Sequence, residues 1–250
     1  MPLKEEFRSQ GDLLFKYRSY FPIVIIMVGL AVYFNELAKG GDSLEYINSF
    51  NYQMVCYGIA AFGLLVRVLA IGFSADNTSG RNTTEGQIAD TINKTGLYSI
   101  FRHPLYVGNY FMWLGIACLT ANLWFIIAFT FMFWLYYERI MFAEEEYIRN
   151  LYGDAYVEWA SRTPAFWPAF TKWKKPALKF SWVKIIRQEK AGILNLFLIM
   201  MVFNFINQYY FTDTVNIYNY ASYLFAGSVV WYIIIKVIQK TTSVLELDRA

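Results

Sequence analysis

About six long apolar runs limit what this 250-residue chain can fold into. Each run has roughly the 17 to 25 residues that an α-helix needs to cross a bilayer. Hydrophobic residues make up 57% of the chain and charged residues only 16%, so a soluble fold would expose large apolar patches. We therefore predict an all-α integral membrane protein with about six transmembrane helices. The predicted spans are residues 20–38, 52–73, 104–120, 122–142, 191–211 and 219–239.

The basic residues of the chain fall almost entirely on one side of these predicted spans. With the N-terminus inside, the outside connections are residues 39–51, 120–122 and 212–218. Of the 22 Lys and Arg residues, these connections contain only Lys39. Cytoplasmic loops carry such an excess of cations, so the two longer loops, residues 74–103 and 143–190, are expected inside. We therefore predict a multi-pass protein whose active site faces the cytoplasm.

The loops divide the chain into three predicted parts. Residues 1–90 hold two spans and a cytoplasmic loop, residues 91–168 hold a helical hairpin, and residues 169–250 hold two further spans. A basic, aromatic stretch at residues 166–190 is typical of a segment in the interface of an anionic leaflet. The two cysteines lack the spacing of a zinc or redox site. We expect the bilayer as a partner, and neither a metal nor a nucleic acid.

An arginine and the single histidine of the chain precede the third predicted span. Arg102 and His103 stand directly before Pro104, and proline is tolerated at the first position of a helix. The N-terminus of this helix would point into the cytoplasm, where its free N–H groups and dipole bind anions. Gly108, one turn further, lets another backbone or a flat ligand approach closely. Arginine before a membrane helix can equally be only a positively charged anchor.

An acidic cluster follows the fourth predicted span. Glu144, Glu145 and Glu146 are consecutive there, and Glu138 and Arg139 precede them. The connection between spans three and four is so short that the two helices must be antiparallel neighbours. The acidic cluster then meets the arginine and histidine on one face of the membrane, which predicts a ligand carrying both signs of charge. A solvated helix face with ordinary ion pairs is the alternative.

Both clusters belong to longer spaced motifs. The first has the pattern Gly-x-Tyr-x-x-x-Arg-His-Pro-x-Tyr-x-Gly, which is Gly96, Tyr98, Arg102, His103, Pro104, Tyr106 and Gly108 here. The second has the pattern Glu-Glu-x-x-Leu-x-x-x-Phe-Gly-x-x-Tyr, which is Glu144, Glu145, Ile148, Tyr152, Gly153 and Tyr156, with isoleucine and tyrosine in place of leucine and phenylalanine. Over residues 91–168 the chain resembles the isoprenylcysteine carboxyl methyltransferase family and the wider group that includes membrane phospholipid methyltransferases.

The resemblance implies that S-adenosylmethionine is the cofactor and that it binds in a cytoplasmic pocket. The implied cofactor-binding residues are Asp90, Thr91, Ile92, Asn93, Tyr98, His103, Pro104, Leu105, Tyr106, Glu144 and Glu145. Arg102 and Arg139 are the candidate catalytic residues, and the resemblance implies that Arg139 holds the acidic group of the substrate. The chemistry agrees, because acids, aromatic rings and donors suit the ammonium, sulfonium and carboxylate of this cofactor.

These features predict an S-adenosylmethionine-dependent membrane methyltransferase that O-methylates a carboxylate or phosphate of a lipid or lipidated substrate. Such nucleophiles are ionised at pH 7 and need no general base. One alternative is N-methylation of a phospholipid amine, which would need a base. The other is a non-catalytic six-span transporter or receptor, which would predict charged residues within the spans, where almost none are found.

Overall fold

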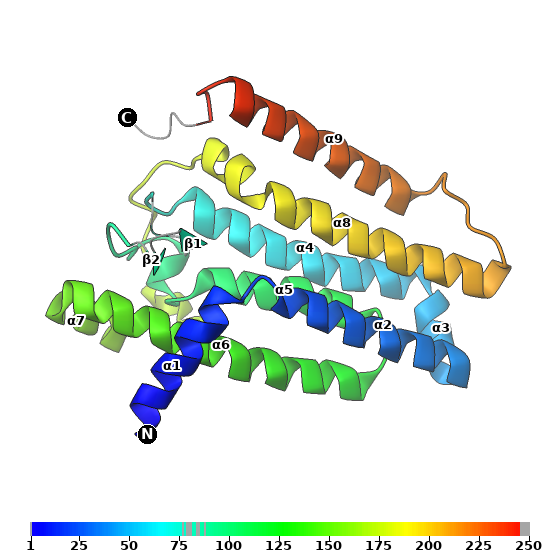
Figure 1. The fold of residues 1–250 in the computed structure, drawn as a ribbon, viewed down its shortest axis with the longest axis horizontal. Helices are drawn as coiled ribbons and strands as arrows, with labels where there is room; N and C mark the ends of the chain where they lie inside the picture. The colour runs from blue at the N-terminus through cyan, green and yellow to red at the C-terminus, as the bar shows by residue number, and fades with distance from the viewer. Residues whose placement is uncertain (1, 77, 79–81, 84–85, 88, 246–250) are drawn as a thin grey trace.

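The structure is a computed structural model that describes residues 2–76, 78, 82–83, 86–87 and 89–245. Most of its helices run alongside one another as a bundle (Figure 1). The helices are α1 (Leu3–Lys16), α2 (Phe21–Lys39), α3 (Asp42–Asn48), α4 (Phe50–Gly72), α5 (Pro104–Cys118), α6 (Leu123–Tyr152), α7 (Asp154–Arg162), α8 (Trp182–Thr212) and α9 (Tyr220–Thr241), with short 3-10 helices at Leu97–Ser99 and Phe170–Lys172. Two-residue strands β1 (Asn82–Thr83) and β2 (Gly86–Gln87) pair antiparallel in the loop after α4. Apart from this hairpin, the prediction of an all-α fold is confirmed over the described residues.

Five helices of the described chain, α2, α4, α6, α8 and α9, are long and apolar enough to cross a bilayer. The third predicted span corresponds to α5, which has only 15 residues. It therefore measures about 22 Å, less than the ~30 Å hydrocarbon core. By contrast α6 has 30 residues and a length of about 45 Å, so its C-terminal part extends past the core. The prediction of about six spans agrees with the structure, with α5 as the short one.

Small residues bring the backbones of α4 and α5 into direct contact. A Cβ atom placed on Gly63 of α4 would lie 2.5 Å from the carbonyl oxygen of Gly108 in α5. A Cβ placed on Gly108 would lie 2.5 Å from Cγ of Arg67. Close packing through small residues is common between membrane helices. The expectation that another backbone approaches Gly108 is therefore confirmed. The same close packing places the side chain of Arg67 against α5.

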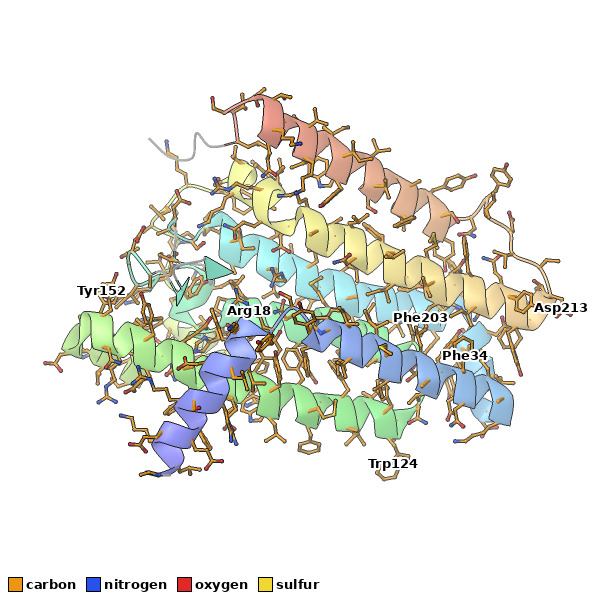
Figure 2. All side chains as sticks on the ribbon, in the orientation of Figure 1. Arg18, Phe34, Trp124, Tyr152, Phe203 and Asp213 are labelled. Atoms are coloured by element: carbon orange, nitrogen blue, oxygen red, sulfur yellow. The ribbon has the colours of Figure 1, made fainter. Side chains whose placement is uncertain are left out.

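The long loops gather at one end of the bundle, which we call the loop end. The hairpin of β1 and β2, α7, the start of α1 and the last turns of α9 lie at this end, whereas α3 lies at the other end (Figure 1). Figure 2 shows Tyr152 at the loop end and Asp213 at the opposite end. The N-terminal helix α1 crosses α6 near the loop end (Figure 1).

Hydrogen bonds tie the long loops to the helices at the loop end. The backbone N–H of Arg102, just before α5, donates to the carbonyl oxygen of Pro164 at 2.9 Å. The fully buried Lys184 of α8 donates to Ser74 Oγ at 2.8 Å, to the Ser74 carbonyl at 3.0 Å and to the Ala75 carbonyl at 2.6 Å. The first contact joins the chain before α5 to the segment after α7. The contacts of Lys184 join the chain after α4 to the start of α8.

Candidate active site

A cavity of about 730 Å³ extends from the loop end into the bundle. We call its polar end the part lined by Tyr98, Arg102, His103, Glu144, Tyr156 and Trp159. We call its apolar end the part lined by Ile26, Met112, Ile116, Leu196 and Ile199. The α5 residues that line the cavity change from polar to apolar along the helix, in the order Tyr106, Asn109, Met112 and Ile116.

Two lining side chains connect the cavity with the outer surface of the bundle. Ile23 of α2 is 52% exposed and Leu198 of α8 is 38% exposed, and both line the cavity. Both belong to helices that are apolar enough to span a bilayer. The cavity therefore reaches the surface that acyl chains would contact.

Arg102 and His103 are held at the polar end by Glu145 of α6. The guanidinium of Arg102 donates to both carboxylate oxygens of Glu145, at 2.8 and 3.2 Å. It also donates to the carbonyl oxygens of Ala160 and Thr163, which joins α5 to α7. Nε2 of His103 lies 2.7 Å from the same carboxylate. The predicted meeting of the two clusters is thus seen in the structure, and Arg102 lies in the wall of the cavity.

Glu144 is the acid of α6 that lines the cavity itself. Its carboxylate accepts a hydrogen bond from the Tyr106 hydroxyl at 2.6 Å. It also lies 3.8 Å from Nδ1 of His103 and 3.9 Å from the guanidinium of Arg18. Figure 2 shows Arg18 where α1 meets α2. Glu144 therefore presents a carboxylate that suits an ammonium group or ribose hydroxyls.

Tyrosine hydroxyls at the polar end stay neutral. Burial raises the pKa of the Tyr98 phenol, and the nearby charge of Glu144 adds to the rise. Burial, followed by the charge of Glu145, likewise raises the pKa of Tyr156. Both phenols therefore keep their protons near pH 7 and are able to donate hydrogen bonds.

The loop residues predicted to bind the cofactor lie outside the cavity wall. Asp90 and Thr91 are exposed, and neither they nor Ile92 and Asn93 line the cavity. The Asn93 amide instead organises the loop, because its Oδ1 accepts from the Ala75 N–H at 2.9 Å and its Nδ2 donates to Thr78 Oγ1 at 2.7 Å. Thr78 and Ala89, which are neighbours of these residues in the same loop, do line the cavity. Pro104 and Leu105 line the cavity as expected.

Arg139 points away from the cavity. Its guanidinium lies 3.6 Å from the centre of the Phe7 ring in α1 and bonds Glu138 at 2.7 Å and Gln10 at 3.2 Å. Helix geometry explains this, because five residues rotate Arg139 by about 140° from Glu144 around α6. The structure therefore does not bring Arg139 together with the other predicted site residues.

A tryptophan that the sequence motifs did not single out also lines the polar end. Nε1 of Trp159 is buried and makes no hydrogen bond to any described residue. Trp159 lies one helical turn after Tyr156 on α7, and the two rings are 5.8 Å apart. The i,i+3 spacing of these aromatic residues in a short amphipathic helix was the available signal. A buried donor of this kind requires an acceptor from a ligand or solvent.

The sequence reasoning also missed an arginine within a predicted span. Arg67 of α4 lines the cavity and is paired with Glu189 of α8 through Nε at 3.0 Å and Nη2 at 2.5 Å. Its Nη1 donates to Oδ1 of Asn109, whose Nδ2 donates to the Tyr137 hydroxyl at 3.3 Å. An ionisable group inside a span is itself a signal of function, so this residue was recognisable in the sequence.

Comparison with known proteins finds a family model and several relatives that are similar to part of this chain. Residues 52–155 match the family model described as phospholipid methyltransferase. The protein-S-isoprenylcysteine O-methyltransferase of Schizosaccharomyces pombe is 29% identical over 120 residues, which cover 46% of this chain and 48% of that protein. The protein-S-isoprenylcysteine O-methyltransferase B of Arabidopsis thaliana is 32% identical over 115 residues, or 43% of this chain and 58% of that protein. The cobalt-zinc-cadmium resistance protein CzcN of Cupriavidus metallidurans is 32% identical over 89 residues, or 36% and 41%.

The matched region contains Arg67, the whole first motif and the second motif as far as Gly153, and it ends before α8 begins. The alignments of this chain with the three relatives cover about half of the length of those proteins. No solved structure matches the chain. With its apolar helices and its two motifs around one cavity, the chain is an integral, multi-pass membrane protein whose residues 52–155 are similar to the phospholipid methyltransferase family.

Proposed function

We propose that the protein is an S-adenosylmethionine-dependent methyltransferase that O-methylates a carboxylate or phosphate on a lipid or lipidated substrate. The continuity of the cavity supports this most directly, because one space joins acids and aromatic rings to aliphatic side chains. A polar cofactor and a lipid-bearing acceptor can therefore meet inside it. The volume of about 730 Å³ also lies within the roughly 300–1,000 Å³ of small-molecule sites.

The groups at the polar end fit S-adenosylmethionine, which supplies an electrophilic methyl group when bound. The carboxylate of Glu144 would hold its ammonium or its ribose hydroxyls. Nε1 of Trp159, a buried donor without a partner among the described residues, would be satisfied by an oxygen or a purine nitrogen. Tyr98 and Tyr156 add neutral donors and aromatic faces beside these groups.

A carboxylate or phosphate is ionised at pH 7 and loses no proton to a base. The protein would therefore only have to orient this oxyanion toward the methyl group of the cofactor. Fixed donors in a cavity with little water stabilise and orient such a group better than solvent does. The rings of Tyr106, Trp113 and Tyr137 also line the cavity. The aliphatic side chains beyond them suit the tail of a lipid, which gains about 0.8 kcal/mol for each buried CH₂ group.

We also propose that the polar end faces the cytoplasm. The loop end carries the exposed lysines Lys172, Lys174 and Lys175 in the segment before α8. The segments at the opposite end hold a single cation, Lys39. An excess of lysine and arginine marks the cytoplasmic side of membrane proteins, so the distribution supports this orientation.

The function is tested with purified protein in lipid nanodiscs and S-adenosylmethionine labelled in its methyl group. Three acceptors are compared: N-acetyl-S-farnesylcysteine for a carboxylate, phosphatidic acid for a phosphate and phosphatidylethanolamine for an amine. Mass spectrometry locates the added methyl group. Methylation of a carboxylate or phosphate oxygen is expected, whereas methylation of the amine alone would replace the proposal with phospholipid N-methylation.

Two neighbouring glutamates of α6 provide a matched pair of variants for this test. Glu144→Gln removes the carboxylate at the polar end and is expected to weaken cofactor binding by about tenfold or more. Glu146→Gln changes a carboxylate that pairs with Lys4 of α1 at 3.1 Å and does not line the cavity, so it should bind the cofactor as the wild type does. Absence of cofactor binding to the wild-type protein at millimolar concentration would refute the proposed function.

A further inference from the structure

An ion pair between α4 and α8 forms part of the cavity wall. Arg67 and Glu189 both line the cavity, and Glu189 is only 1% exposed. Burying two charges among apolar helices is costly even when they are paired. Because burying these charges is costly in free energy, the simplest explanation of a pair beside a cavity is a role other than packing.

The hydrogen bonds of this pair leave N–H donors available on the Arg67 side chain. The two oxygens of Glu189 each accept from the Arg67 guanidinium. A guanidinium has five N–H groups, and described residues accept from three of those of Arg67, two to Glu189 and one to Asn109. Two N–H groups remain to donate to a ligand. These two N–H groups can donate to the oxygen atoms of an anion.

Arg67 lies between the two ends of the cavity. Asn109, which bonds its guanidinium, is one turn of α5 from Tyr106, the partner of Glu144 at the polar end. Asn109 is also one turn from Met112 in the opposite direction, where the apolar end begins. An acidic head group bound to Arg67 would thus lie beside the cofactor-binding groups with its lipid tail among aliphatic side chains.

Glu189 comes from a helix that the family match does not include. The matched residues end at 155, and α8 begins at Trp182. The two bonds from Glu189 fix the plane of the Arg67 guanidinium, which directs its remaining N–H groups. In this chain, therefore, the orientation of an arginine of the matched region depends on α8.

We propose that Arg67 binds the anionic head group of the acceptor and that Glu189 is the positioning residue that orients it, so that α8 helps to select acidic acceptors. The proposal rests on the proposed function for the identity of its ligand as the acceptor. Its binding chemistry, recognition of a carboxylate or phosphate on a lipid, is measurable without methyl transfer.

The test is direct binding of lipid probes to the full-length protein in nanodiscs without cofactor. N-acetyl-S-farnesylcysteine is compared with its uncharged carboxamide, and phosphatidic acid with diacylglycerol, which separates the carboxylate from the phosphate source. The wild type is expected to bind at least one anionic probe about tenfold or more tightly than its neutral counterpart. Arg67→Lys should lose most of this preference, because lysine does not reproduce the planar fork.

Matched variants separate head-group recognition from folding. Arg187→Lys alters an arginine of α8 that does not line the cavity, and it should keep the wild-type preference. Glu189→Gln should reduce the preference, because a single amide oxygen orients the guanidinium less well. The double variant Arg67→Gln/Glu189→Gln leaves no unpaired buried charge, and it should fold and bind the charged and neutral probes equally.

Two results would overturn the inference. One is a wild-type preference for anionic probes that persists in the double variant. The other is loss of S-adenosylmethionine binding by Arg67→Lys with an unchanged probe preference, which would assign the arginine to the cofactor. A wild-type protein that shows the Arg67-dependent preference but transfers no methyl group would support the head-group site and refute the proposed function.

Discussion

Replacing Gly108 by alanine tests whether the contact between α4 and α5 positions the cavity. The new Cβ would lie 2.5 Å from Cγ of Arg67 and 2.8 Å from the carbonyl oxygen of Gly63. Carbon atoms in good contact are about 3.5 to 4.0 Å apart, so Arg67 or the backbone of α4 must move by about 1 Å. The neighbouring atoms include backbone, which cannot rotate away as a long side chain can.

The expected effect of Gly108→Ala has two parts. Overpacking of a tight interface costs about 1 to 3 kcal/mol of unfolding free energy. A displacement of about 1 Å at a residue that positions substrate can also lower turnover by about a hundredfold. Because the polar end is built from other residues, the affinity for S-adenosylmethionine should change much less than turnover.

Thermal unfolding in detergent, cofactor binding and methyl transfer are measured on the same preparations. Gly58→Ala is the matched control on α4, because a Cβ there meets no atom within 4 Å. It should be neutral or slightly stabilising, since alanine is the better helix former. Wild-type unfolding temperature and turnover in Gly108→Ala would show that the helices are not packed as closely as described, and that Arg67 is not placed by this contact.

Three further predictions concern the loop end and the orientation of the protein. Glu145→Gln removes the carboxylate that accepts hydrogen bonds from Arg102 and His103. Thermal unfolding should show that the unfolding free energy falls by about 3 kcal/mol. A loss of stability no larger than that in Glu146→Gln would contradict this prediction. Trp159→Phe keeps an aromatic side chain but removes Nε1, so calorimetry should find cofactor affinity reduced by about two- to tenfold, and unchanged affinity would mean that this donor faces solvent. In a chain without its native cysteines, a cysteine at Trp173 should be protected from an impermeant thiol reagent added outside cells, whereas one at Asp42 should react; the reverse pattern would place the polar end outside.

The membrane class and the meeting of the two motifs could be predicted because their signals are local in the chain. Long apolar runs define the spans wherever the helices later pack, since the bilayer sets the required length. The Arg102 and Glu145 contact also followed from local information, because the four-residue connection between α5 and α6 leaves only an antiparallel arrangement. The length of the apolar run does not show that α5 ends after 15 residues. Nor does it show that α5 packs directly against α4.

The side of α6 that faces the cavity was decided by rotation around the helix. Arg139 and Glu144 look adjacent in the sequence, but about 140° separates them, whereas Tyr137 lies seven residues from Glu144 and returns to the same face. Tyr137 accordingly lines the cavity, and Arg139 packs on Phe7 of α1. The helical period was readable in advance, but which face meets the cavity depends on α1 occupying the other one.

Only the tertiary structure paired Arg67 with Glu189, which lie 122 residues apart. Sequence alone identifies a cation in a predicted span and an acid near the start of another helix, and it contains no signal that joins them. Their meeting depends on the order in which α4, α5 and α8 pack and on how each helix is rotated. Those choices come from the combined packing of many side chains, including the absence of a side chain at Gly108, so they belong to the folded protein and not to any one segment.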